Sequence, residues 1–320
     1  MKQIFIAGLI SLSLATSAQA GLVLHDSGYE HFLRSNFQAF PIAVDSSGLI
    51  HVVTSTSTSA DLRRVNLNNS VTTLNSSVGA IIGINADLEF GFGGDLFANA
   101  QGAIRRFSMP GGAGSNFVTG SMSHTGGLAY DPISGLLWVT YGVGNDTFIE
   151  SYNSSGTMID FFSYVGVGSP NGLTADSSGD LLLINYDENA GIRRIDTGTG
   201  TAQLLTDFSS STLSPVNGIV TDNAGDIFFT GDLNGGTGVY RVDSTGSNLN
   251  LIASNPISGF NIAIGPSGDG SGTQSIYLTS PHVHEINELR PVAVPEPSSI
   301  VLLGVGGIAL VAAGWRRKRQ

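Results

Sequence analysis

The sequence predicts an all-β fold, a six-bladed β-propeller, from three observations. Gly contributes 43 of 320 residues and charged residues only 12%, and Gly supplies the positive φ angles that tight hairpins need. Hydrophobic residues make up 41% of the chain and come in strand-length bursts, which argues against disorder. One motif also recurs six times, at the spacing of propeller blades.

The recurring motif is an apolar strand, an Asp-x-x-Gly corner and a second apolar strand. Its clearest copies span residues 171–185 and 217–231. The corner predicts a hairpin, because Asp bonds the turn backbone and Gly takes the left-handed position. The corner repeats every 42–46 residues, at Asp45, Asp87, Asp131, Asp176, Asp222 and Gly265.

A second motif, apolar-x-x-apolar followed by Asn, Asp or Ser, recurs in the same register. Blades one to five then offer a fourth strand, such as residues 71–74 or 203–206. Blade six offers none, because Asn287 leads directly into a Pro-rich linker. The segment 29–35 looks like the missing strand. We therefore expect an N-terminal strand to complete the last blade, which would close the ring of blades.

The N-terminal residues 1–20 have the pattern of a signal peptide. Lys2 precedes an apolar run, and Ala18-Gln19-Ala20 matches the small-residue cleavage site. We expect cleavage after Ala20. The mature propeller would then begin at residue 21 and extend to residue 290.

The C-terminal residues predict a linker and a membrane span. Residues 291–298 are rich in Pro and include Pro295-Glu296-Pro297, which cannot continue a helix. Residues 299–320 hold an apolar segment close to the ~20 residues that span a bilayer. The stop-transfer cations follow as Arg316, Arg317, Lys318 and Arg319, which places the body outside the cytoplasm. An ordinary membrane anchor is the alternative.

This order of Pro-Glu-Pro, span and basic end resembles the PEP-CTERM sorting signal. The resemblance implies a Gram-negative host that makes extracellular polysaccharide. It also implies an exosortase, a membrane transpeptidase that removes the tail. The protein would be exported and membrane-anchored through the C-terminal helix, and after processing would lie on the cell surface or in the extracellular matrix.

The charge of the mature body limits its partners. Without residues 1–20 and 298–320 the chain keeps nine Arg, no Lys and 25 acidic residues, a net charge of −16. Such a surface repels nucleic acid and anionic lipid, and it is compatible with sugars or divalent cations. The chain has no Cys, so disulfides, zinc–thiolate sites and thiol nucleophiles are excluded.

The repeats, over about residues 25–290, resemble six-bladed propellers of the NHL and gluconolactonase-like (strictosidine-synthase-like) superfamily. In its lactonases a divalent cation lies at the mouth of the central channel. The resemblance places the ligand positions at Phe40, Gly126, Asn171 and Asn217, and Asn217 stands where the lactonases have an Asp base. Ca²⁺ prefers carboxylates, and Asn-Gly is a common turn dipeptide. A structural turn and a calcium site at Asn171 and Asn217 therefore both stay open.

Other polar residues offer weaker candidates for a site. Asp146, Asp187 and Asp232 follow second strands and would either line the channel mouth or be solvated loop carboxylates. His282 and His284 share a strand face, but no third metal ligand is nearby. Arg pairs at 63/64, 105/106 and 193/194 occupy one fixed place per blade, which favours a structural role.

The sequence leaves three functions open. The first is a non-catalytic surface propeller that binds envelope polysaccharide or another protein. The second is a calcium-dependent lactonase-like or esterase-like hydrolase with its site at the channel mouth. The third is a purely structural component of the extracellular matrix.

Overall fold

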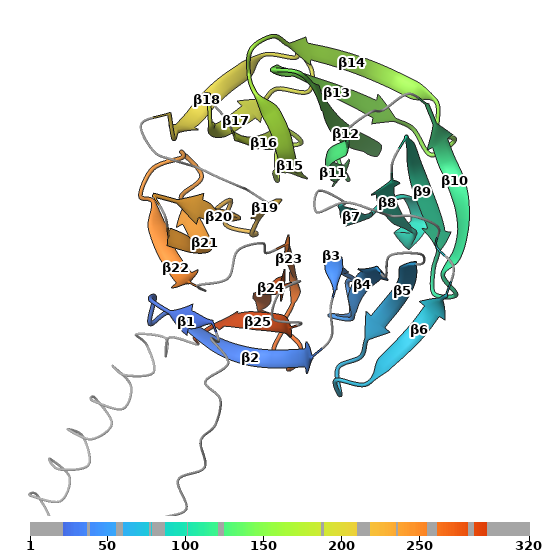
Figure 1. Ribbon diagram of the computed structural model, residues 1–320, viewed down its shortest axis with the longest axis vertical. Coiled ribbons are helices and arrows are strands. Elements are labelled where there is room, and N and C mark those ends of the chain that lie inside the picture. The colour runs from blue at the N-terminus through green and yellow to red at the C-terminus, as the bar shows by residue number, and fades with distance from the viewer. Residues whose placement is uncertain are drawn as a thin grey trace, which may run out of the picture.

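The computed structural model describes residues 22–36, 39–55, 60–76, 78, 87–100, 102–120, 125–186, 189–209, 218–234, 236–254, 261–280 and 285–292. These residues form six antiparallel sheets around a central axis (Figure 1). The predicted six-bladed propeller is confirmed. The predicted signal peptide and membrane span lie outside the described residues. Among these described residues, the structure contains no helix with the length and hydrophobicity of a membrane span.

Each blade contributes four strands, counted outward from the axis. The inner strands are β3 (Phe40–Val44), β7 (Leu88–Phe90), β11 (Thr125–Asp131), β15 (Ser169–Ala175), β19 (Gly218–Thr221) and β23 (Asn261–Pro266). The second strands are β4 (Ile50–Ser55), β8 (Leu96–Ala100), β12 (Leu136–Val143), β16 (Leu181–Tyr186), β20 (Ile227–Leu233) and β24 (Gln274–Ser280).

The third and outer strands complete the blades. The third strands are β5 (Ala60–Val65), β9 (Ala103–Ser108), β13 (Asp146–Tyr152), β17 (Gly191–Ile195), β21 (Gly236–Val242) and β25 (Glu285–Pro291). The outer strands are β6 (Val71–Asn75), β10 (Ala113–Thr119), β14 (Met158–Tyr164), β18 (Ala202–Asp207), β22 (Asn250–Ser254) and β2 (Tyr29–Asn36). A short 3₁₀ helix, η1 (Phe92–Gly94), joins β7 to β8.

The N-terminal strand closes the ring, as predicted. Strand β2 pairs antiparallel with β25, from Tyr29 opposite Pro291 to Asn36 opposite Glu285. Just before it, β1 (Val23–Leu24) pairs with β22, the outer strand of blade five. The N-terminal segment therefore joins two blades, as the blue strands in Figure 1 show. This second attachment has no counterpart in the repeat pattern.

The Asp-x-x-Gly corner forms as predicted in blade four. The Oδ1 atom of Asp176 accepts from the backbone N–H groups of Ser178 at 2.8 Å and Asp180 at 3.1 Å. Gly179 has a φ of +88°, which L side chains rarely adopt. The same carboxylate pairs with Nε of Arg194 at 3.2 Å. Each Arg–Arg pair has at least one member that pairs with an Asp of its own blade. The other two contacts are Arg63 with Asp61 at 2.9 Å and Arg106 with Asp95 at 2.6 Å.

In blades two and six the predicted corner residue is wrong. Gly91, not Asp87, closes the blade-two turn, with its N–H donating to the Asp95 carbonyl at 2.9 Å. In blade six the corner is Ser267 rather than Gly265, because the β23–β24 hairpin is longer and its ladder reaches Pro266. The sequence pattern locates an Asp or a Gly, but the backbone pairing decides where the turn falls.

The core consists of separate layers between neighbouring blades. In β16, Leu181 and Leu183 pack toward blade three, against residues such as Trp138. Leu182 and Ile184, pointing the other way, pack toward blade five, against residues such as Phe229. Both faces of a central strand are therefore buried, which explains its continuous apolar run.

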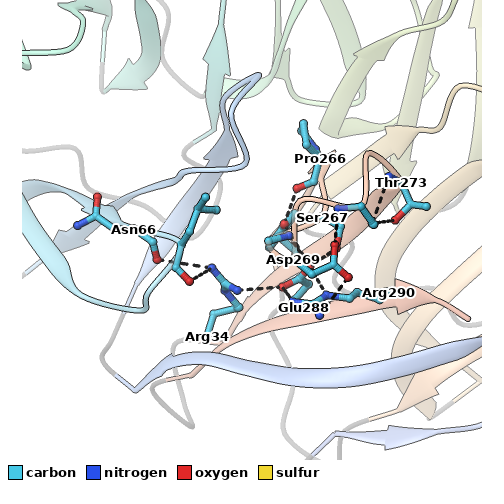
Figure 2. A network of polar contacts seen from close by, with 12 residues as sticks. Arg34, Asn66, Pro266, Ser267, Asp269, Thr273, Glu288 and Arg290 are labelled. Atoms are coloured by element: carbon cyan, nitrogen blue, oxygen red, sulfur yellow. Dashed lines mark hydrogen bonds and ion pairs between the residues drawn. The ribbon is translucent and has the colours of Figure 1, made fainter.

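A buried ion network connects the closing strand to its blade (Figure 2). Glu288 on β25 is 0% exposed and lies 3.4 Å from Nη1 of Arg34, which is on β2 and 5% exposed. Arg290 donates to both oxygens of Glu288, at 2.8 and 3.1 Å, and pairs with Asp269 at 3.4 Å.

The network also reaches blade one and the blade-six corner. Arg34 donates from Nη2 to the Leu67 carbonyl at 3.4 Å, and Gly268 N–H donates to Glu288 at 3.0 Å. Burial favours a raised pKa for Glu288, but hydrogen bonds from Arg290 and Gly268 hold its pKa below its ordinary value. Glu288 is therefore ionised between two Arg side chains, and it connects both ends of the described chain.

Candidate functional site in the central channel

A cavity of about 130 Å³ lies on the propeller axis and is lined by all six inner strands. Most of its lining is aliphatic, with Leu, Ile and Val from every blade. Four lining residues carry polar side chains: Asp87 and Glu89 in blade two, Thr174 in blade four and Asn261 in blade six. The cavity is therefore lined mainly by aliphatic residues, and its two carboxyl groups come from one blade.

Asp87 connects blade two to blade three. Its Oδ2 accepts from the Leu128 N–H of β11 at 2.8 Å, and its Oδ1 accepts from the Leu88 N–H at 2.9 Å. Its own N–H donates to Oδ1 of Asn99 at 2.5 Å. The carboxyl group thus satisfies a backbone donor on the edge of β11 that no strand pairs with.

Glu89 lies in β7, two residues after Asp87, so the two side chains point to the same side of the chain. It accepts from the Tyr130 N–H of the same β11 edge. Burial raises the pKa of Asp87 to about 7, and burial together with the nearby Asp87 charge raises the pKa of Glu89 to about 8. Near neutral pH both carboxyls are therefore partly protonated.

The other blade junctions in this half of the ring use Gly instead of an acid. A Cβ on Gly127 would lie 2.1 Å from the Leu173 N atom, and one on Gly172 would lie 3.1 Å from the Ile219 N atom. The ladder puts Leu88 opposite Ala98 and Leu173 opposite Leu183, so Asp87 occupies the blade-two equivalent of Gly172. Blades two and three are thus joined through carboxyl groups where other blades meet backbone to backbone.

Sequence reasoning missed this acid pair because it placed Asp87 in a turn. One signal was available: the next corner Gly, Gly94, lies seven residues after Asp87 rather than three. Moving the corner to Gly91 places Glu89 in the inner strand β7 and Asp87 directly before it.

The candidate ligand positions at the channel mouth are only partly described. Asn171 is 7% exposed and lies within β15, at a bulge between Pro170 and Gly172 rather than in a turn. The structural turn expected at Asn171 is therefore wrong, and close blade packing explains Gly172. Gly126 has no side chain, the Phe40 side chain is apolar, and Asn217 lies outside the described residues. Of the described positions in this set, none supplies the carboxylate that a divalent cation prefers.

The remaining candidates do not meet at the cavity. Asp146 begins β13 and accepts from the Gly166 N–H at 2.9 Å, and Asp232 lies in β20 opposite Thr237. Neither lines the channel cavity. Asp187, His282 and His284 lie outside the described residues. Among the residues that the structure does describe, no three His, Asp or Glu side chains come together as a metal site would require.

The acid pair predicts that stability depends on pH. Both carboxyls bind protons more tightly in the folded chain than in the unfolded chain, since their pKa values rise from about 4 to about 7 and 8. Their contribution to the free energy of unfolding should therefore be largest below pH 4 and fall as the pH rises toward 8. We expect the Asp87→Asn/Glu89→Gln double variant to lose this decline.

Urea unfolding of the protein and the double variant at pH 5 and pH 8 measures the effect. The difference between the two proteins isolates the pair from other titrating groups. An unchanged difference in unfolding free energy between the two pH values would show that the carboxyls titrate as exposed acids do.

Comparison with known proteins identifies the C-terminal end. Residues 293–319 match the family model described as the PEP-CTERM protein-sorting motif. The chain carries a PEP-CTERM sorting signal. This signal indicates an exported, membrane-anchored sorting substrate and implies processing by an exosortase. The matched residues lie outside the part of the chain that the structure describes, and no curated protein matches this PEP-CTERM chain.

Solved structures similar to this PEP-CTERM chain share its propeller fold. A gluconolactonase from Xanthomonas campestris has a TM-score of 0.60 and 12% identity, over 84% of this chain and 94% of its own. The virginiamycin B lyase from Staphylococcus aureus has a TM-score of 0.53 and 14% identity, over 82% and 99%. A chain of the nidogen/laminin complex has a TM-score of 0.56 and 16% identity, over 73% and 86%. At such identities the likeness shows the fold alone.

Proposed function

We propose that this exported propeller is a non-catalytic binding protein of the cell envelope, and that its partner is an extracellular polysaccharide. The observation that carries the proposal is that the two carboxyls of the channel cavity are engaged in joining blades two and three. Asp87 and Glu89 accept backbone N–H groups of the next blade, and the four positions that the lactonase resemblance marks supply no carboxylate. The channel chemistry therefore supports joining blades better than it supports turnover.

The proposal includes processing at both ends. A signal peptase would cleave after Ala20, and an exosortase would act near Pro295-Glu296-Pro297. The domain boundaries would be residues 1–20, 21–290, 291–298 and 299–320. The mature propeller would then reside on the cell surface or in the extracellular matrix of a Gram-negative bacterium.

Retention by polysaccharide tests the binding function. We expect the full-length protein to be slowed in affinity electrophoresis gels that contain extracellular polysaccharide from a host with an exosortase, and to run normally in empty gels. A protein that stays with the matrix in cells but binds no polysaccharide in a glycan panel would instead be a structural matrix component or bind an envelope protein.

A calcium-dependent lactonase-like hydrolase is the second candidate. One observation favours it: the channel cavity holds two carboxyls whose pKa values rise to about 7 and 8, as in many acid–base sites. Asn171 and Asn217 would be its metal ligands. A panel of lactones and esters, with and without added Ca²⁺, tests it. Calcium-dependent turnover that Asn171→Ala abolishes would overturn the binding-only proposal.

A further inference from the structure

Blade three carries several exposed apolar side chains. Six apolar side chains among the described residues 133–165 are at least half exposed: Ile133, Val143, Met158, Ile159, Phe161 and Val165. The outer strand β14 carries three of them, including Phe161 at 50% exposure. The three on β14 follow one another closely along a single outer strand, and neighbouring exposed apolar side chains are typical of interaction surfaces.

Three aromatic rings cross this blade from strand to strand. Tyr141 on β12 stacks on Phe148 on β13, with ring centroids 5.2 Å apart and an interplanar angle of 19°. Phe148 stacks in turn on Phe161 on β14, at 6.0 Å and 25°. This aromatic row of Tyr141, Phe148 and Phe161 ends at the half-exposed ring of Phe161, on the outermost strand.

A carboxylate lies beside the exposed end of the row. Glu150 is the register partner of Phe161 across the β13–β14 ladder. It accepts from the Tyr141 hydroxyl at 2.9 Å and from the Tyr152 hydroxyl. Burial and the Glu150 contact raise the pKa of Tyr141 to about 12, so the hydroxyl stays protonated and keeps orienting the carboxylate. Each carboxylate oxygen has a second lone pair for a further donor.

We propose that the aromatic row and Glu150 form a binding site for a neutral polysaccharide. This inference rests on the proposed function and names both the site and the class of glycan. The C–H face of a sugar ring would pack on Phe161, whose electron-rich ring attracts polarised C–H groups. A sugar hydroxyl would donate to Glu150, and exposed Ile159 would extend the apolar surface along β14.

The charge of the protein selects for a neutral chain. The body between the two end segments has a net charge of −16 and no Lys, so a polyuronate would be repelled. Glu150 adds a negative charge at the site itself. A glycan that carries hydroxyls but no carboxylates can pack on the Phe161 ring and donate to Glu150 without electrostatic repulsion.

Isothermal titration of the full-length protein with a soluble neutral β-glucan and with alginate, a polyuronate, tests the site. We expect binding of the β-glucan and little heat with alginate. Phe161→Ala should weaken β-glucan binding at least about tenfold, and Glu150→Gln should weaken it less. Phe161→Trp should keep binding, since it preserves an aromatic face. Leu204→Ala is the matched control, because Leu204 is similarly exposed (45%) on the outer strand of blade four.

The outcomes separate the site from the proposed function. If the protein binds the β-glucan and Phe161→Ala binds equally well, the site is wrong although the binding function stands. If alginate binds and the β-glucan does not, the glycan class is wrong. If neither binds and sedimentation shows a dimer that Phe161→Ala dissociates, blade three is an interface between copies. Circular dichroism melting of each variant confirms that lost binding does not reflect lost folding.

Discussion

Replacing Glu288 with Gln is expected to lower the free energy of unfolding by about 3–5 kcal/mol, the usual cost of removing one partner from a buried ion pair. Arg34 is only 5% exposed and would keep its charge without its carboxylate partner. Arg290 would lose the same partner. Urea unfolding at pH 7 measures the loss.

Two further variants show whether charge is the cause. Asp61→Asn removes the pair with Arg63 at 2.9 Å, whose partners are 25% and 33% exposed, and should cost less than about 1 kcal/mol. The double variant Arg34→Met/Glu288→Gln removes both buried charges and should be more stable than Glu288→Gln alone. A double variant less stable than Glu288→Gln would mean that packing of the Arg34 stem, rather than ion pairing, holds the closing strand.

Replacing Gly127 with Ala is expected to destabilise the propeller by more than about 3 kcal/mol, at the upper end of overpacking effects. The added Cβ would lie 2.1 Å from the Leu173 N atom and 2.7 Å from the Gly172 carbonyl carbon. Both contacts are with backbone, so no side chain can rotate away. The inner strands β11 and β15 would have to separate, which would open the junction between blades three and four.

Gly120→Ala is the matched control, because a Cβ at Gly120 would meet nothing within 4 Å. Its effect should stay within about 0.5 kcal/mol. Thermal unfolding monitored by circular dichroism compares the two variants. A Gly127→Ala melting temperature equal to that of Gly120→Ala would show that the blades tolerate a wider axis than the structure suggests.

Local patterns predicted most of the architecture. The Asp-x-x-Gly corner at Asp176 depends on one carboxylate and one left-handed Gly within four residues, so it can be recognised without knowing the fold. The closing strand was also predictable, because blade six lacks a fourth strand and residues 29–35 could supply one. The sorting signal was visible for the same reason, since its parts are contiguous in the chain.

The candidate sites were less predictable because the residues that form them are distant from one another in sequence. Asn171-Gly172 looks like a turn, yet it lies within β15, where the close approach of Ile219 favours Gly. Tyr141, Phe148 and Phe161 show no motif along the chain and become a row only when three strands are in register.

The sequence alone determined the all-β class, the six-fold period, the closing strand and the C-terminal sorting signal, because each depends on spacing or on neighbouring residues. Only the tertiary structure decided what Asp87 does. As a corner residue it would be a solvated turn carboxylate. The hairpin corner lies four residues later, at Gly91, so Asp87 lies on the axis instead. There burial raises the pKa of Asp87, and the Leu128 N–H of the next blade donates to it. This contact depends on how closely blades two and three approach each other at the axis. No local sequence pattern encodes the distance between two blades.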